Sequence, residues 1–271
     1  MLIRCGYDIR FETETKTAMM AMLSLHPSRH QDLRTPQRLL ADPDIPLYQF
    51  EDVFGNVATR LSIPPGGVTL SCEFVIEDNG EPDMRPANGP QMAVEDLPDF
   101  VMPFLLGSRY CETDRLMDVA WSNFGHYSNA RDRVDAIVDF VHRHIEFGYH
   151  YARPDKTAWN GYQERQGVCR DFAHLAITLC RCMNLPARYC TGYLGDIGVP
   201  AADAPMDFSA WFDVYIDGSW YTHDARHNKP RIGRILMARG RDATDVALTT
   251  AFGPATLARF DVYTDEVQSV E

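Results

Sequence analysis

A proline-rich stretch near the end of the first third of the sequence separates two segments with different hydrophobic patterns. Residues 79–98 read NGEPDMRPANGPQMAVEDLP and contain four prolines, a composition typical of a connection between domains. Before it, residues 2–11 roughly alternate apolar and polar side chains, and residues 49–78 offer three more short strands separated by turn residues. The sequence therefore predicts a β-sandwich-like or barrel-like domain over residues 1–98.

After this connection the hydrophobic pattern becomes helical. Residues 129–146 place apolar side chains at i, i+3, i+4, i+7 and i+11, which predicts an amphipathic helix. A second helix is expected to begin at or just after Cys169. Two aromatic-rich runs on either side of Asp217-Gly218 predict a β-hairpin with a type I′ turn. We therefore expect residues 99–271 to form a second domain of the α+β class, entered through short helices.

Composition limits the classes of partner. The chain has 26 basic and 38 acidic side chains and a net charge of −12, whereas nucleic-acid binding depends largely on basic side chains that neutralise phosphates. We therefore expect neither nucleic acid nor an anionic membrane surface as a partner. No run of 18 apolar residues occurs, and the N-terminus carries charges where an export signal is apolar, so we expect a cytoplasmic protein. Seven cysteines in a reducing compartment predict free thiols.

Cys169 follows a glycine and a valine at the expected start of a helix. A helix N-terminus stabilises a thiolate through its partial positive charge and its free N–H groups, so this position suits a nucleophile. A buried structural cysteine and a metal ligand are the competing interpretations. The spacing of Cys180, Cys182 and Cys190 does not fit a zinc site. A redox disulfide would need Cys180 or Cys182, and three helical turns, roughly 16 Å, separate them from Cys169. We therefore expect neither a metal site nor a redox disulfide.

The sequence GVCRDFAHLAITLCRCMNLPARYCTGY, followed by AWFDVY and WYTHDARHN, resembles the bacterial transglutaminase-like superfamily over about residues 130–250. Members share a papain-like α+β core, and one bacterial branch carries a β domain before it. The resemblance implies a helix with a nucleophilic cysteine packed on an antiparallel sheet, acting on a peptide or protein without a cofactor. Cys169 matches the nucleophile, and Asp224 matches the acid that orients the catalytic histidine. Ser209 occupies the position where the family usually has that histidine.

The base that would activate Cys169 is therefore the main question that the sequence raises. A serine cannot replace an imidazole, because it does not exchange a proton near neutral pH. Counting from the predicted turn, Ser209, Trp211, Asp224 and Arg226 share one face of the hairpin, so Ser209 lies where a base is needed. His227 is our first candidate for a substitute base, and His223, which should point to the opposite face unless a bulge intervenes, is the second. The third possibility is that this chain supplies no base.

Three further residues have both functional and structural interpretations. Gln163 lies six residues before Cys169, where papain-like enzymes often donate an oxyanion hydrogen bond, although we favour a solvent-facing glutamine there. The Cys169 backbone N–H at the helix start is the stronger oxyanion donor. Trp211 is either a wall of the cleft or packing within the hairpin. His174 lies nearly half a turn off the helix face of Cys169, which predicts a structural role.

These residues support two functions. In the first, Cys169 attacks an amide carbonyl and forms an acyl-thioester that water or an amine resolves, as in a peptidase, an amidohydrolase or an acyl transferase on a peptide or isopeptide. In the second, Ser209 marks a non-catalytic descendant whose cleft binds a peptide or a protein without cutting it. The sequence predicts no particular oligomeric state.

Overall fold

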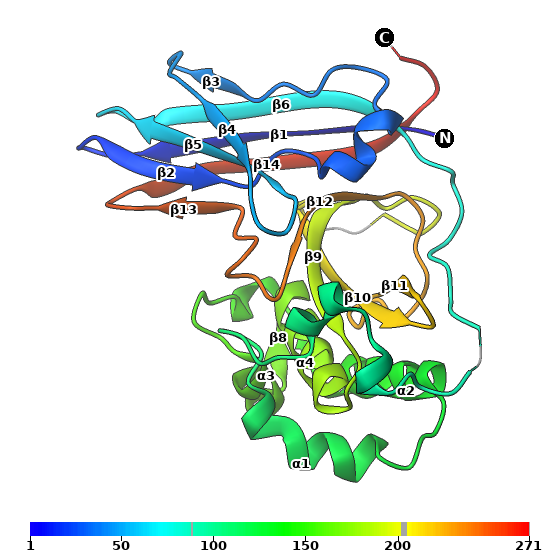
Figure 1. Ribbon diagram of the computed structural model, residues 1–271. Coiled ribbons are helices and arrows are strands. Elements are labelled where there is room, and N and C mark those ends of the chain that lie inside the picture. Colours follow the sequence, from blue (N-terminus) through cyan, green and yellow to red (C-terminus); the bar gives the residue numbers. More distant parts are fainter. Residues whose placement is uncertain (88, 202–204, 271) are drawn as a thin grey trace.

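Two antiparallel sheets build one end of the molecule. The computed structural model describes residues 1–87, 89–201 and 205–270. One sheet has the strand order β14-β1-β6-β3 and the other has the order β13-β2-β5-β4, and Figure 1 shows them packed together. Both sheets contribute to one hydrophobic core, which confirms the predicted sandwich-like fold. The strands from the first third of the chain are β1 (Leu2–Glu12), β2 (Thr17–Ala21), β3 (Leu40–Asp42), β4 (Tyr48–Glu51), β5 (Val57–Ile63) and β6 (Val68–Glu77), with a short 3-10 helix η1 (Pro27–Asp32).

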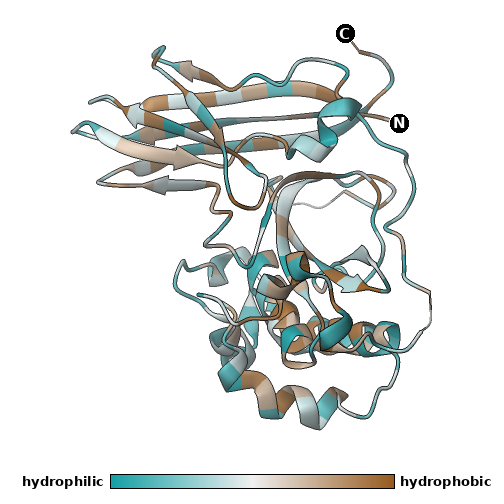
Figure 2. Ribbon diagram, in the orientation of Figure 1, coloured by the Kyte–Doolittle hydropathy of each residue, from teal (hydrophilic) through white to brown (hydrophobic). Residues whose placement is uncertain are grey.

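Strand β1 shows how the sequence pattern becomes the core of this sandwich. Its alternate side chains point to opposite faces of the sheet, so one set is buried and the other meets water. Figure 2 shows the resulting alternation of hydrophobic and hydrophilic residues along the strands of the sandwich. The buried set consists of Ile3, Cys5, Tyr7, Ile9 and Phe11.

The last strands of the chain correct our domain boundary. We expected residues 99–271 to form the second domain, but β13 (Thr249–Ala251) pairs with β2, and β14 (Thr256–Val267) pairs with β1 along its whole length. The reason is that a period of two identifies a strand without identifying its partner. Strand β1 has two edges, and β6 takes one of them while β14 takes the other. The sandwich therefore contains both ends of the chain, which lie near each other in Figure 1.

The α+β core lies between these two contributions to the sandwich. Helix α4 (Cys169–Cys182) runs through it, packed on the sheet β11-β10-β9-β12 and contacted by the other three helices. The remaining helices are α1 (Thr113–Phe124), α2 (Ala130–His144) and α3 (Ala158–Glu164), and the 3-10 helices are η2 (Val94–Asp96), η3 (Asp99–Phe104) and η4 (Tyr149–Tyr151). The strands are β7 (Glu146–Phe147), β8 (Gln166–Gly167), β9 (Ala187–Leu194), β10 (Ser209–Ile216), β11 (Ser219–His223) and β12 (Arg234–Gly240). Among the described residues, no helix is long and apolar enough to cross a membrane.

The predicted hairpin sets the register of this core sheet. Asp217 and Gly218 both have positive φ angles, as a type I′ turn requires, and Ile216 pairs with Ser219 across the turn. The hairpin and its turn are therefore confirmed. Strand β11 ends at His223, so the following residues leave the sheet and form a turn.

The sandwich and the α+β core share buried side chains. Tyr193 and Ile235 belong to the core sheet, yet they are fully buried among the side chains of the sandwich. The chain after β9 also passes close to strand β14, because a Cβ atom on Gly195 would lie 2.5 Å from the carbonyl oxygen of Thr264. The two parts are therefore close-packed around these residues, and we expect them to unfold together.

Ile235→Ala tests this joint. Removing a buried isoleucine side chain costs about 2–5 kcal/mol, so the variant should unfold at lower denaturant concentration than the wild type. Because all four tryptophans lie in the α+β core, fluorescence follows that part, while far-UV circular dichroism follows the whole chain. We expect both signals to shift by the same amount. Leu40→Ala, at a side chain that is 60% exposed on β3, serves as the control, and two separate transitions would contradict the shared joint.

Candidate active site

Cys169 is the first residue of helix α4. The preceding Val168 is extended, and its N–H donates a hydrogen bond of 2.9 Å to the Asp171 carboxylate, which fixes the first turn. At this first helical position the Cys169 N–H has no acceptor within the helix and remains available to a ligand. The Cys169 side chain is partly exposed, whereas the other six cysteines are buried. The predicted helix start is thus confirmed, and its thiol faces a cleft.

The surroundings of the Cys169 thiol correct a second expectation. The pKa of the thiol is raised to about 11, mainly by burial and also by the Asp207 carboxylate. The Arg226 guanidinium and a hydrogen bond from the Ala210 N–H lower it, but they do not offset burial. We expected the helix N-terminus to favour the thiolate, and the dry surroundings outweigh that effect. At neutral pH the thiol keeps its proton, so a reaction needs a base.

Ser209 lies beside the nucleophile. It opens strand β10, and the next residue, Ala210, is the one whose N–H donates to the Cys169 sulfur. The Ser209 side chain is buried, and its Oγ has no hydrogen-bond partner among the described residues. The position where the resemblance implies a histidine is therefore next to the thiol, and it holds a hydroxyl group.

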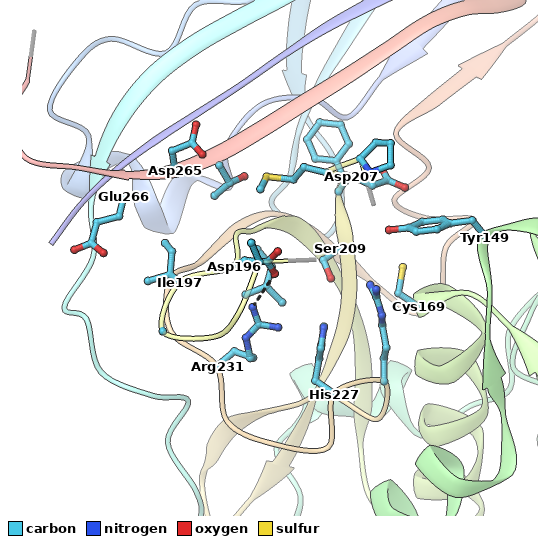
Figure 3. Close-up of a pocket in the computed structure, with 18 residues that line it drawn as sticks. Tyr149, Cys169, Asp196, Ile197, Asp207, Ser209, His227, Arg231, Asp265 and Glu266 are labelled. Atoms are coloured by element: carbon cyan, nitrogen blue, oxygen red, sulfur yellow. Dashed lines mark ion pairs between the residues drawn. The ribbon is translucent and has the colours of Figure 1, made fainter. Parts of the chain in front are cut away.

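An imidazole is nevertheless paired with the expected acid. His227 lies in the turn after β11, where its Nδ1 is 2.8 Å from Oδ2 of Asp224 and its backbone N–H donates to Oδ1 at 3.0 Å. A neutral ring that donates from Nδ1 keeps a lone pair on Nε2. Figure 3 shows His227 and Cys169 pointing into the same pocket, from the turn and from the helix respectively. The structure thus combines an acid and an imidazole in one local turn.

Asp224 also forms a buried ion pair with Arg234. Burial alone would raise the pKa of this carboxyl, but the Arg234 guanidinium and the hydrogen bonds of His227 hold it well below its usual value. Arg234 Nη2 lies 2.9 Å from Asp224 Oδ2, and its Nε lies 2.9 Å from Asp83, a residue of the connection between the domains. The guanidinium also lies 5.1 Å from the ring centroid of Trp211. Trp211 therefore packs against Arg234, and it lines neither of the two cavities that contain Cys169.

The remaining candidates lie outside this arrangement. His223 is buried with its ring 5.8 Å from that of Phe212, and burial lowers its pKa to about 4. It lies on the far side of the hairpin from Cys169, as the strand parity predicts. Gln163 is exposed on α3 and lines neither cavity that contains Cys169. His174 is buried, with its ring stacked on that of Tyr110 at 5.0 Å, and its Nε2 accepts the N–H of Ala243 at 3.2 Å, which is a structural role.

Three residues around the thiol were not singled out as site residues by sequence reasoning. Arg226 stacks on Phe147 with 3.8 Å between its Cζ and the ring centroid, and it interacts with both Tyr149 and Cys169. The alternation of side chains along the hairpin predicted Arg226 on the same face as Ser209, so the sequence did contain a signal for this residue. Tyr149 belongs to a short 3-10 helix and Asp207 to the segment before β10, where no sequence pattern marks them. The three surround Cys169 with a phenol, a carboxyl and a cation.

Two cavities meet at Cys169, in the seam between the α+β core and the sandwich. One has a volume of about 420 Å³ and contains His227, and the other has a volume of about 570 Å³. Strand β14 of the sandwich lines both cavities. Among the described residues, no group of three or more His, Cys, Asp or Glu side chains is arranged to hold a metal ion.

The α+β core is similar to a known protein family. Residues 122–225 match the family model for the transglutaminase-like superfamily. A solved structure described as "a Putative Cysteine Protease from Cytophaga hutchinsonii" is 29% identical, covers 100% of this chain and 92% of its own, and superposes with a TM-score of 0.85. An uncharacterized protein of Mycobacterium leprae is 23% identical over 74% of both chains, and one of Mycobacterium tuberculosis is 27% identical over 72% of this chain and 68% of its own.

The raised pKa of Cys169 predicts how iodoacetamide labels the resting protein. The labelling rate should rise about tenfold per pH unit from pH 7 to pH 10, because the thiolate fraction grows tenfold per unit below a pKa of about 11. Mass spectrometry of tryptic peptides measures the rate at each cysteine. The Cys169→Ser variant should remove the labelling that follows this pH profile, since the other six thiols are buried. A rate that levels off below pH 8 would contradict the raised pKa.

Asp224→Asn tests the buried ion pair through stability. A carboxyl whose pKa is lowered in the folded state stabilises the protein above its unfolded value of 3.8, and this contribution is lost as the pH falls below that value. The variant should therefore lose about 3 kcal/mol of unfolding free energy at pH 7, and the difference should narrow below pH 4. Asp261→Asn, on an exposed face of β14, is the matched control. An equal loss at pH 7 and pH 3 would exclude the ion pair as the cause.

Proposed function

Because the chain carries a transglutaminase-like domain, we propose that it is a cysteine peptidase in which His227 acts as the base for Cys169. The superfamily domain and the 29% identical solved structure support cysteine-based amide chemistry. The observation that carries the finer proposal is the Asp224–His227 pair, with 2.8 Å between Oδ2 and Nδ1, in the cavity that contains Cys169. This pair supplies the general base that Ser209 cannot provide.

The reaction begins with a protonated thiol. As the Cys169 sulfur attacks the carbonyl carbon of the amide, its proton passes to Nε2 of His227, and the carbonyl oxygen becomes an oxyanion. The Cys169 backbone N–H at the start of α4 donates a hydrogen bond to that oxyanion. Asp224 fixes the tautomer of the ring and stabilises the imidazolium that forms.

Collapse of this intermediate breaks the carbon–nitrogen bond. His227 returns the proton to the departing amine, and the acyl group remains on the Cys169 sulfur as a thioester. Water then attacks the thioester with His227 as the base again, which releases the acid and restores the thiol. The solved structure described as a cysteine protease supports water over an amine as the second reactant.

A non-catalytic peptide-binding module is the second candidate function. Ser209 is the observation that favours it, because a hydroxyl stands where the resemblance implies a histidine. In this function the same cleft holds a peptide, and the thiol remains protonated because of its raised pKa. The two functions differ in whether a bound peptide is cut.

A quenched fluorescent peptide library distinguishes the two functions. We expect the wild type to cleave members of the library and Cys169→Ala to cleave none. His227→Gln should reduce kcat/KM by about 10²- to 10⁴-fold, the usual contribution of a positioned base. His126→Gln, an exposed histidine outside both cavities, is the matched control and should retain activity. Wild-type protein that binds library peptides without cleaving them would establish the binding module.

The variant Ser209→His tests whether His227 has replaced the usual base. Introduced together with His227→Gln, it places an imidazole at the strand position beside the thiol. We expect the double variant to recover at least tenfold of the activity that His227→Gln loses, as measured by kcat/KM on the best library peptide. If His227→Gln alone remains fully active, the base is a different group and the proposal fails.

A further inference from the structure

The two cavities that meet at Cys169 differ sharply in chemistry. Both are lined by Cys169 itself and by the three residues 207–209, so a substrate whose carbonyl carbon reaches the sulfur extends into both. We call the one of about 420 Å³ the acidic cavity and the one of about 570 Å³ the apolar cavity. Their difference indicates which residues flank the bond that is cut.

Carboxylates outnumber cations in the acidic cavity. Arg231 pairs with Asp196 at 3.7 Å, and Asp265 pairs with Arg4 at 3.2 Å. The four carboxylates therefore exceed the cations by one even when Arg4 is counted with Arg226 and Arg231. Figure 3 shows the carboxylates distributed around the pocket, from the loop after β9 to the end of β14. They belong to Asp196, Asp207, Asp265 and Glu266.

One buried hydroxyl group in the same cavity points independently to a ligand. Ser209 is 5% exposed, and its Oγ has no hydrogen-bond partner among the described residues. The Thr264 hydroxyl lines the same cavity and interacts with the Cys5 thiol. A buried hydroxyl without a partner costs free energy, which a bound donor recovers. Figure 3 shows Ser209 directed into the space between Asp196 and Cys169. Carboxylates and hydroxyls together form a set of acceptors, which suits an ammonium or guanidinium group because these groups only donate.

The apolar cavity is the larger of the two and is lined mainly by side chains without charge. The arginines at its edge are paired, Arg153 with Glu164 at 2.8 Å and Arg170 with Asp171 at 3.4 Å. Its volume accommodates an aromatic or a large aliphatic side chain. The sandwich supplies much of its apolar wall through Ile9, Phe11, Leu248, Leu257 and Phe260, and Val246 closes it from the loop after β12.

The position of His227 sets the direction of the substrate. His227 lines the acidic cavity and not the apolar one. In the proposed function His227 protonates the departing amine, so the residue that leaves must lie on its side of the thiol. The residue that forms the thioester then lies in the apolar cavity.

We propose that the protein cuts the amide bond between an apolar residue, which becomes the acyl group on Cys169, and a cationic residue, whose side chain binds the carboxylates of the acidic cavity. This inference rests on the proposed function for its direction. Its charge preference rests on the lining of the acidic cavity alone.

Four quenched peptides that differ only at the cut bond test the inference, with the pairs Phe–Lys, Phe–Glu, Glu–Lys and Lys–Phe. We expect kcat/KM for Phe–Lys to exceed that for each of the other three by at least about tenfold. Glu266→Lys reverses one charge in the acidic cavity and should reduce the preference for Phe–Lys over Phe–Glu by about threefold or more. Asp261→Lys makes the same charge change elsewhere on β14, outside both cavities, and should leave the preference unchanged.

Binding of the same peptides to Cys169→Ala, followed by fluorescence anisotropy, separates the two proposals. If the wild type cleaves Phe–Glu as well as Phe–Lys, the cationic site is refuted while the peptidase stands. If nothing is cleaved but Cys169→Ala binds Phe–Lys more tightly than Phe–Glu, the peptidase and the substrate direction fail and the cationic site remains. Equal binding of all four peptides without cleavage would refute the whole inference.

Discussion

The buried carboxylate of Asp224 is the point on which the arrangement of this site depends. One oxygen binds both the Arg234 guanidinium at 2.9 Å and the His227 ring at 2.8 Å, while the other accepts the backbone N–H of His227. A carboxylate buried this deeply is stable only when its charge is paired and its lone pairs are bonded. Arg234 in turn reaches Asp83, so the connection between the domains contributes to the same network. The orientation of the imidazole therefore depends on two distant parts of the chain, the segment 224–234 and the connection that contains Asp83.

The joint between the sandwich and the α+β core has a comparable role for the cleft. Strand β14 lines both cavities, and it is held by pairing with β1 along eleven residues of the first strand. The core by itself would present Cys169 on an open surface at the start of α4. Burial in the seam raises the pKa of the Cys169 thiol to about 11, so the thiol needs a base before it can act as a nucleophile. The same seam forms the walls of both cavities that contain Cys169, so the pKa of the thiol and the lining of the cavities depend on one joint.

Local patterns were sufficient to predict most of the fold. The start of α4 at Cys169, the turn at Asp217-Gly218 and the register of the hairpin all follow from short-range rules, and the structure agrees with them. The pairing of β14 with β1 could not be predicted, because periodicity does not choose between partners. Tyr149 and Asp207 approach the thiol through tertiary packing, and the pKa of Cys169 is set by that packing too. The helix N-terminus by itself would lower the pKa of Cys169. Burial by residues distant in the sequence raises this pKa by more, so the net shift is upward.

The exchange of a histidine for Ser209 is understandable in terms of geometry. A base on β10 would have to reach Asp224 across the hairpin, so its orientation would depend on the alignment of two strands. His227 reaches Asp224 over three residues of one turn, and the backbone N–H of the same residue binds the same carboxylate. A short local loop orders few residues, so this pairing has a small entropic cost. In the proposed function position 209 does not need to carry a proton, and the buried Ser209 hydroxyl lines the cavity that contains His227. Because the Asp224–His227 pair lines the same cavity as Cys169, a serine at position 209 does not by itself indicate an inactive cleft.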